Sequence, residues 1–384
     1  MGVVNVFCSY YPFLALLCIE GVGAVESEKL WEAASKSPRE VFEQLRSRTG
    51  QKELSLLAGR PLGEIRWDIF TSQIDAADAS QTRIICLIDE EYPQYLRDIR
   101  TSPPVLFCRG NIQSLRRRGV AIVGTRQPSA RGAAFTRAIA RDLSACSIMV
   151  ASGLARGIDT AAHQGALEGS GPVVGVMGTG LDVCYPVENR SLMDAVASRG
   201  CIITEQFMGT TPRSYVFPQR NRLISAVSRI VIVVEAGNKS GALITAKWAT
   251  EQGREVGAVP GFPGDFRSCG VNRLLKMGAA PIEGIKDIFD AVPLLAEGLD
   301  AGPCNSGPRR RSDNGTLLAG GEPNDTDNAG LSAVLNALTS SPIDVDALAG
   351  HLDRDVREVQ SALLELEMKG IVGRDLAGCY YKRK

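Results

Sequence analysis

Seven short runs of apolar residues, separated by longer helical stretches, dominate the middle of this chain. They cover residues 84–88, 120–124, 147–153, 172–178, 200–205, 229–236 and 255–261, and they are rich in Val and Ile. None alternates strictly between apolar and polar residues, which is typical of strands buried on both faces. Such strands alternate with helices in doubly wound α/β folds. The sequence therefore predicts a Rossmann-like, mostly parallel sheet covered by helices over residues 84–292.

Regions of different character flank this predicted sheet, so the 384 residues divide into more than one domain. Residues 1–80 show helical apolar spacing around a Gly21-Val22-Gly23 turn, which indicates a SAM-like or helix-hairpin-helix-like domain. Such a turn either contacts a phosphate through its amides or only connects packed helices, and both readings stay open. Residues 297–330 are rich in Gly, Pro, Asn and Asp, which predicts a flexible linker. Residues 331–384 contain three helical segments and a hairpin, the pattern of a winged-helix-like domain.

Neither a membrane span nor a metal site is expected. The apolar start of the chain is interrupted by Pro12 and Glu20, well short of a membrane span, so we expect residues 13–19 to form a core helix in a cytoplasmic protein. The ten cysteines include no C-x-x-C pair, and His163 and His351 are the only histidines. This spacing does not suit a zinc site.

Charge is unevenly distributed although it sums to zero. From Arg109 to Gly278 the chain has 21 basic and 11 acidic residues, whereas the remainder has 22 and 32. Eighteen of the 21 basic residues are arginines, which make bidentate contacts to phosphate and stack on bases. A basic middle between acidic flanks indicates an anionic ligand, although a solvated surface can show such an excess by chance.

Four of the predicted strands end in glycine-containing turns. In chain order these are Gly124-Thr125-Arg126, Ser152-Gly153, Gly178-Thr179-Gly180 and Gly237 followed by Ser240-Gly241. Ligands of doubly wound sheets bind beyond the carboxyl ends of the strands, where glycine lets backbone amides approach phosphate. Each turn alone also fits an ordinary left-handed turn. Together, with Arg126, Arg156 and Lys239 in the same segments, they predict an extended anion-binding rim.

Known nucleotide-binding motifs do not occur at these turns. Arg126 stands where G-x-G-x-x-G needs its second glycine, and no G-x-x-x-x-G-K-[ST] is present. NAD and ATP are therefore disfavoured, and no cofactor is expected.

No catalytic residue is expected either. We predict that His163 packs or forms hydrogen bonds on a helix face. Asp159, Asp182, Glu205 and Glu235 are predicted to hold neighbouring arginines and turn amides rather than to act as an acid or a base.

Aromatic residues precede a basic group in the segment YVFPQRNRLISAVS. Tyr215 and Phe217 come just before Arg220, Asn221 and Arg222. Such a group suits a single nucleic-acid strand, since the bases stack while arginines neutralise the backbone. Pairing of a structural arginine with Glu235 or Glu205 is the alternative, and both readings can hold for different arginines of the set.

Several ordered segments resemble the DNA processing protein A family, also called DprA or Smf. Over residues 92–282 these segments are YPQYLRDIRTSPPVLFCRGN, VAIVGTRQPSARG, VASGLARGIDTAAHQGAL, VMGTGLDVCYP, FPQRNRLISAVS, VVEAGNKSGALITAKWATEQGREVGAVPG and SCGVNRLLKMGA. The resemblance implies a homodimer that binds and protects incoming single-stranded DNA in natural transformation. It also implies loading of the RecA recombinase onto that strand, and no enzymatic activity.

The family's motifs fall on residues of the predicted rim. The loop after Pro186 reads VENR where relatives often have a lysine, which leaves Arg190 as the expected substitute. The expected DNA- and phosphate-binding residues are Gly124, Thr125, Arg126, Ser152, Gly153, Arg156, Gly178, Arg190, Arg220, Asn221, Arg222, Lys239, Ser240 and Gly241.

The alternative function is a nucleotide-processing enzyme that resembles nucleoside monophosphate phosphoribohydrolases. Those proteins use a P-G-G-x-G-T-x-x-E loop, and the corresponding stretch Gly237–Thr245 lacks the glutamate. This difference argues against hydrolysis.

The winged-helix-like region is acidic. From Asp344 to Gly370 it has seven acidic and three basic residues, a balance that repels DNA. We expect this region to bind a protein or to regulate the rest of the chain.

Overall fold

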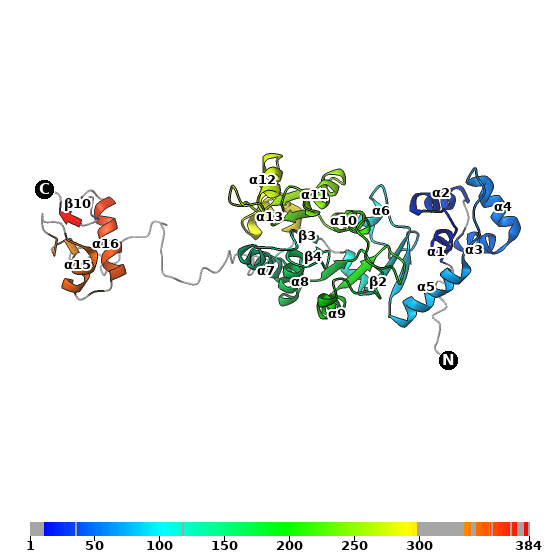
Figure 1. Cartoon of the computed structure of the whole chain (residues 1–384), viewed down its shortest axis with the longest axis horizontal. Helices are drawn as coiled ribbons and strands as arrows, with labels where there is room; N and C mark the ends of the chain where they lie inside the picture. The colour runs from blue at the N-terminus through cyan, green and yellow to red at the C-terminus, as the bar shows by residue number, and fades with distance from the viewer. Residues whose placement is uncertain are drawn as a thin grey trace. The chain divides into compact units, whose positions relative to one another are not determined.

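The computed structural model describes residues 11–34, 37–116 and 119–297 and, near the C-terminus, 334–335, 337–338, 343–352, 354, 356–368, 371–374 and 380–382 (Figure 1). The chain divides into two compact units, Met1–Arg309 and Arg310–Lys384. The predicted linker over 297–330 lies almost entirely outside the described residues.

In the described part of the first unit, five helices precede the sheet. They are α1 (Pro12–Leu17), α2 (Ala24–Ala34), α3 (Pro38–Arg46), α4 (Arg48–Leu57) and α5 (Trp67–Ala79). The side chains of Phe13, Leu14 and Leu16 are completely buried, so α1 is the core helix that its apolar spacing predicts. At Gly21, between α1 and α2, φ is +81°, and the Arg60 side chain donates a hydrogen bond of 3.0 Å to the Gly21 carbonyl. No described helix has the length and apolar character needed to cross a membrane.

Nine strands form one sheet in the order β1-β2-β6-β5-β4-β3-β7-β8-β9. Their bounds are β1 (Arg83–Cys86), β2 (Val105–Gly110), β3 (Gly119–Val123), β4 (Met149–Ser152), β5 (Val173–Val176), β6 (Cys201–Thr204), β7 (Ile230–Val233), β8 (Glu255–Ala258) and β9 (Ala280–Pro281). Only β2 pairs antiparallel, with β1 and β6. Each predicted run overlaps a strand, and the mostly parallel α/β fold is confirmed. β2 and β9 escape the sequence prediction because their apolar runs are very short and adjoin proline.

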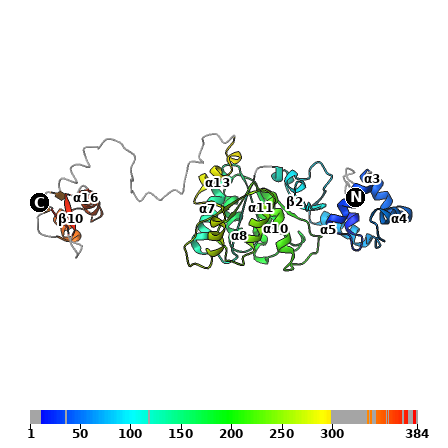
Figure 2. The same ribbon diagram turned by 90° about the horizontal axis from the view of Figure 1, so that it is seen from above.

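Helices cover both faces of the sheet (Figures 1 and 2). One apolar cluster contains side chains of α7 (Ala130–Ala145), α8 (Ile158–Glu168), α9 (Arg190–Arg199) and α13 (Ile285–Ala291), and a second contains those of α10 (Val216–Ala226), α11 (Ala242–Glu251) and α12 (Cys269–Lys276). Along β3, Val120 and Ile122 pack into the first cluster, whereas Ala121 and Val123 pack into the second. Because both faces are covered, successive residues of a strand are all apolar.

The second unit has a core of its own. It contains α15 (Val345–Leu352), α16 (Val356–Met368) and the antiparallel pair of β10 (Val372–Arg374) and β11 (Tyr380–Lys382). Leu348, Val359 and Leu363 are among its buried side chains. Helices followed by a strand pair agree with the predicted winged helix, although the first predicted helix, 331–338, lies only partly within the described residues.

Helix α8 packs closely against the backbone of α7 at Gly165. A Cβ atom there would lie 2.1 Å from the carbonyl oxygen of Arg137. Gly165→Ala must push the two helices apart, so we expect the free energy of unfolding to fall by about 1–3 kcal/mol. Urea unfolding measures this change.

Gly284→Ala is the matched control, because a Cβ there meets no atom within 4 Å and the backbone is extended at φ −166°. It should change stability by less than about 0.5 kcal/mol. Equal unfolding curves for the two variants would contradict the packing argument.

Candidate nucleic-acid interface

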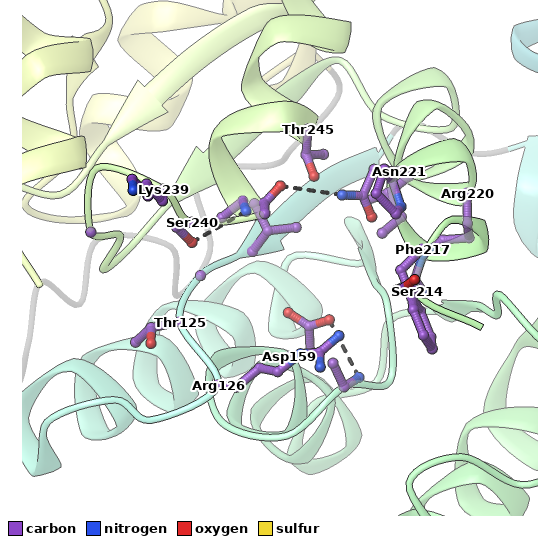
Figure 3. A pocket seen from close by; sticks show the side chains of 18 of the residues that line it. Thr125, Arg126, Asp159, Ser214, Phe217, Arg220, Asn221, Lys239, Ser240 and Thr245 are labelled. Atoms are coloured by element: carbon purple, nitrogen blue, oxygen red, sulfur yellow. Dashed lines mark hydrogen bonds between the residues drawn. The ribbon is translucent and has the colours of Figure 1, made fainter. Parts of the chain in front are cut away.

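A cavity of about 860 Å³ opens at the carboxyl ends of the central strands (Figure 3). Strand β3 has β4 on one side and β7 on the other, so the chain continues in opposite directions from this point. Doubly wound sheets bind ligands at such a topological switch point. The loops after β3 and β7 and the helix α10 line the cavity.

Basic side chains outnumber carboxylates in the lining of this cavity. The basic side chains are Arg126, Arg213, Arg220, Lys239 and Arg267. The only lining carboxylate among the described residues, Asp159, is buried and accepts hydrogen bonds from the amides of Gly153 (3.1 Å) and Ala155 (3.3 Å). Burial raises the pKa of Asp159, while Arg220 and these hydrogen bonds oppose that shift. The cavity therefore favours an anion.

The Arg126 side chain lies over an aromatic ring with its charge free. Its guanidinium carbon is 5.4 Å from the ring centroid of Phe217, and this ring contacts Tyr185 at a centroid distance of 5.5 Å. Within the described residues Arg126 has no carboxylate partner within 4 Å. The preceding residue is held firmly, because the Thr125 amide donates to the Glu235 carbonyl (2.7 Å). Stacking on Phe217 orients the guanidinium and leaves it available to a ligand.

The start of α11 forms another wall of the cavity. Asn221 on α10 donates a hydrogen bond of 3.2 Å to the Gly241 carbonyl, and the Ser240 hydroxyl accepts one of 3.3 Å from the Ala242 amide (Figure 3). A Cβ at Gly241 would meet no atom within 4 Å, so its backbone faces open space. Lys239 is exposed beside it. A helix N-terminus flanked by an exposed cation attracts phosphate.

At three of the predicted glycines a side chain would crowd a neighbour, severely at Gly124 and Gly153 and mildly at Gly178. A Cβ at Gly124 would lie 2.6 Å from Ile158, one at Gly153 would lie 2.7 Å from the Arg220 guanidinium, and one at Gly178 would lie 3.1 Å from the Phe217 ring. Packing within the protein therefore accounts for glycine at these three positions, without a ligand.

Arg220 is a buried structural arginine at the edge of the cavity. Its Nη1 donates to the carbonyls of Gly153, at 2.7 Å, and Val176. Burial lowers the pKa of Arg220 to about 10, an effect that Asp159 opposes and the Arg126 charge increases. Arg220 ties the carboxyl ends of β4 and β5 together.

The structure does not bring Ser152, Arg190 and Arg222 to the cavity. Ser152 is completely buried and donates its hydroxyl to the Ile122 carbonyl (2.7 Å). Arg222 forms a two-bond ion pair with Glu205, at 3.1 and 2.5 Å. Arg190 is exposed at the start of α9 and lines neither this cavity nor the smaller one beside it. Their expected contacts with DNA are therefore not supported.

Arg156 lies beside the main cavity. It lines the smaller adjoining cavity together with Arg126 and Gly178. Its guanidinium forms an ion pair with Glu188 at the surface.

The four acidic residues singled out in the sequence all have structural partners, as predicted. Asp159 and Glu205 are described above. Asp182 accepts from the Gly209 amide (2.8 Å), and Glu235 accepts from the Ser129 amide (2.9 Å) and hydroxyl (2.5 Å). Ser129 also caps α7. His163 is completely buried on α8, and burial lowers its pKa to about 3.

Sequence reasoning missed two arginines of the cavity, Arg213 and Arg267. Arg267 lies 4.4 Å from the ring centroid of Phe266 and donates to the Gln127 carbonyl (3.1 Å). Arg213 donates to the Tyr215 hydroxyl (3.2 Å). Each lies within two residues of an aromatic in the chain, the same signal that singles out the segment containing Arg220.

Comparison with known proteins agrees with this geometry. Residues 83–293 match the family model of DNA recombination-mediator protein A. The chain belongs to this family. Residues 321–376 match the model of the DprA winged helix domain. The resemblance predicted from the sequence motifs is therefore confirmed.

Similar members of the DNA recombination-mediator protein A family come from several bacteria. Protein Smf of Synechocystis is 35% identical over 314 residues, 77% of this chain and 79% of that protein. DNA processing protein DprA of Streptococcus pneumoniae is 40% identical over 203 residues, 53% and 72% of the two chains.

Two solved structures of DNA processing protein A share the fold. The X-ray structure from Streptococcus pneumoniae has a TM-score of 0.56 and 33% identity, covering 70% of this chain and 98% of that one. The structure from Helicobacter pylori, described for its single-stranded DNA binding mode, has a TM-score of 0.51 and 29% identity, covering 56% and 96%.

The ion pair of Arg222 with Glu205 predicts a stability effect separate from binding. Their side chains are only 10% and 14% exposed, so Arg222→Met leaves a buried carboxylate unpaired. We expect a loss of about 3 kcal/mol in the free energy of unfolding. The double variant Arg222→Met/Glu205→Met removes both charges and should recover most of this loss. A double variant no more stable than Arg222→Met, in urea unfolding, would contradict the assignment.

Proposed function

We propose that this chain binds single-stranded DNA in the cavity at the ends of β3 and β7. The observation that supports this most strongly is Arg126, which stacks on Phe217, has no carboxylate partner among the described residues and lines a cationic cavity. A family relative from Helicobacter pylori is described for its single-stranded DNA binding mode. DNA processing is the function that names the relatives from Streptococcus pneumoniae and Bacillus subtilis.

The proposed contacts divide between backbone and bases. Phosphates bind Arg126, Lys239 and the amides at the start of α11, where Gly241 leaves the backbone open. Bases stack on the exposed rings around the cavity, of which Tyr215 is 55% exposed and Phe266 67% exposed. Aromatic rings accept any base that is not already stacked in a duplex, so this arrangement favours single strands without sequence preference.

No catalytic step is part of this proposal. Asp159 accepts hydrogen bonds from turn amides, and Glu235 is occupied by Ser129. Neither carboxylate faces the cavity as a free acid or base. Because both carboxylates already accept these hydrogen bonds, they also argue against the alternative function, a nucleotide hydrolase.

The remaining parts of the proposal rest on family membership. We propose that the chain acts as a homodimer, protects incoming DNA in natural transformation and loads RecA in the cytoplasm. The helical region 1–80, the core 84–292 and the winged-helix region 331–384 are proposed as its domains, joined after the core by the linker 297–330.

Arg126→Ala tests the proposed DNA site. Loss of one phosphate contact should weaken binding of a labelled oligo-dT about tenfold at every sequence and lower the salt slope by about 0.7. Fluorescence anisotropy at low and physiological salt, with the matching duplex for comparison, measures both effects. Arg141→Ala is the control, because this exposed arginine on α7 pairs only with the adjacent Asp142. Parent-like binding by Arg126→Ala would overturn the site.

The acidic winged-helix unit should not bind DNA. Residues 310–384 form a compact unit with their own apolar cluster. We expect no gel shift of single-stranded or duplex oligonucleotides by this fragment at physiological salt, because its helical region has a net negative charge. A clear shift would contradict its proposed role in protein contact or regulation.

A further inference from the structure

A second cavity, of about 640 Å³, opens at the amino ends of the strands. It lies between α6 (Gln94–Arg97) and the residues that precede β7 and β8. These strands are parallel neighbours in which Ile230 pairs with Glu255. The preceding residues, Arg229 and Arg254, therefore stand side by side, at the opposite edge of the sheet from the proposed DNA site.

The two arginines share one aromatic ring and have no acidic partner among the described residues. Their guanidinium carbons lie 4.8 and 5.5 Å from the ring centroid of Tyr95. Both Nε atoms are buried without a hydrogen-bond partner in the described part of the chain. No carboxylate of the described residues lies within 4 Å of either group. Burial and the Arg229 charge both lower the pKa of Arg254.

Such a pair is unfavourable for the folded protein alone. Like charges on neighbouring strands repel each other, and a buried donor without an acceptor loses its hydration. Other buried arginines have acceptors, since Arg222 is paired with Glu205 and Arg220 donates through Nη1 to two carbonyls, although the Arg220 Nε also lacks a partner. An anion bound between Arg229 and Arg254 would relieve the repulsion between the two charges.

The rest of the cavity keeps a positive balance. Arg97 and Arg116 also line it, and each donates to a backbone carbonyl, of Asp89 (2.9 Å) and Glu90 (3.3 Å) respectively. Glu90 and Asp98 are its only lining carboxylates among the described residues, and Asp98 accepts from Gln94 (2.6 Å). Four cations thus face two carboxylates.

We propose that Arg229 and Arg254, oriented by Tyr95, form a second binding site for the phosphodiester backbone of nucleic acid. Stacking on the ring restricts the planar guanidinium groups and leaves their outer N–H groups to grip a phosphate in two-bond fashion. That the phosphate belongs to DNA rests on the proposed function, whereas the anion site itself does not.

A protein partner fits this cavity less well. Protein interfaces are centred on apolar or aromatic anchors that fill pockets of the partner. None of the exposed large apolar side chains of the described residues lines the cavity, and Tyr92 is buried. The half-exposed ring of Tyr95 is already covered by the two guanidinium groups, so the cavity offers mainly charge, which suits a phosphate backbone.

The number of oligonucleotides bound per chain tests the inference. The probe is labelled oligo-dT of about six nucleotides, short enough to occupy one site, in equilibrium dialysis against the full chain at low salt. We expect two molecules per chain for the parent and one for Arg229→Gln/Arg254→Gln. Arg126→Ala should bind one molecule with the parent's affinity at the second site and another about tenfold more weakly at the first.

The control variant removes two positive charges elsewhere. Arg141→Gln/Lys286→Gln changes two exposed residues, each of which pairs with an acidic residue of its own helix. This variant should still bind two oligonucleotides per chain. Arg229→Gln/Arg254→Gln removes a repulsion, so its melting temperature should be no lower than the parent's. Tyr95→Leu keeps both charges but removes the ring, and it should weaken the second site severalfold.

The outcomes separate this inference from the proposed function. Equal stoichiometry for the parent and Arg229→Gln/Arg254→Gln would overturn the second site. A single bound molecule whose affinity Arg126→Ala lowers about tenfold would also overturn it and leave the proposed function standing. A single molecule that only Arg229→Gln/Arg254→Gln abolishes would support the second site and refute the first. Binding of labelled polyglutamate, but not oligo-dT, at these arginines would replace DNA by an acidic protein and overturn the proposal.

Discussion

The buried guanidinium of Arg220 holds together the edge of the sheet on which the main cavity is built. It bonds to the carbonyls at the ends of two adjacent strands, at Gly153 and Val176. This position exists only because residue 153 has no side chain, since a Cβ there would collide with the guanidinium. Asp159 then accepts the amides of the same turn and offsets the buried charge. With its pKa near 10, Arg220 stays protonated at neutral pH and its charge contributes to the cavity.

Much of the fold can be predicted from the sequence, because strands buried on both faces of a sheet consist of continuous apolar runs. The strands from β3 to β8 all overlap such runs. β2 does not stand out, because it is a short apolar segment between Pro104 and Arg109 and it becomes a strand through pairing with β1 and β6. That pairing depends on segments far away in the chain, so local composition cannot predict it.

The site was harder to predict from the sequence than the fold. The three consecutive residues Arg220, Asn221 and Arg222 show why. Arg220, Asn221 and Arg222 lie in one turn of α10, where consecutive side chains point about 100° apart. Arg220 enters the sheet edge, Asn221 reaches the start of α11, and Arg222 turns to Glu205. Consecutive residues of the sequence thus have different structural roles. The glycines raise the same difficulty. Gly124 and Gly241 both follow a predicted strand in the sequence, yet the Ile158 side chain occupies the space beside Gly124, whereas the space beside Gly241 is open.

The surroundings of each arginine give a physical criterion that the sequence lacks. Where an arginine serves the fold, as Arg222 does, a carboxylate or several carbonyl oxygens neutralise or satisfy it. Where it stacks on an aromatic ring and no described carboxylate pairs with it, as for Arg126 on Phe217 and for Arg229 and Arg254 on Tyr95, its charge stays available to a ligand. The basic residues in the middle of the chain therefore do not form one continuous surface. They are divided between opposite edges of one sheet, and at each edge a ring orients the guanidinium while leaving its charge uncompensated. Arg229 and Arg254 are half-buried, so their uncompensated charges destabilise the folded chain, which agrees with the anion site proposed between them, whereas Arg126 is exposed and its charge is held at little cost.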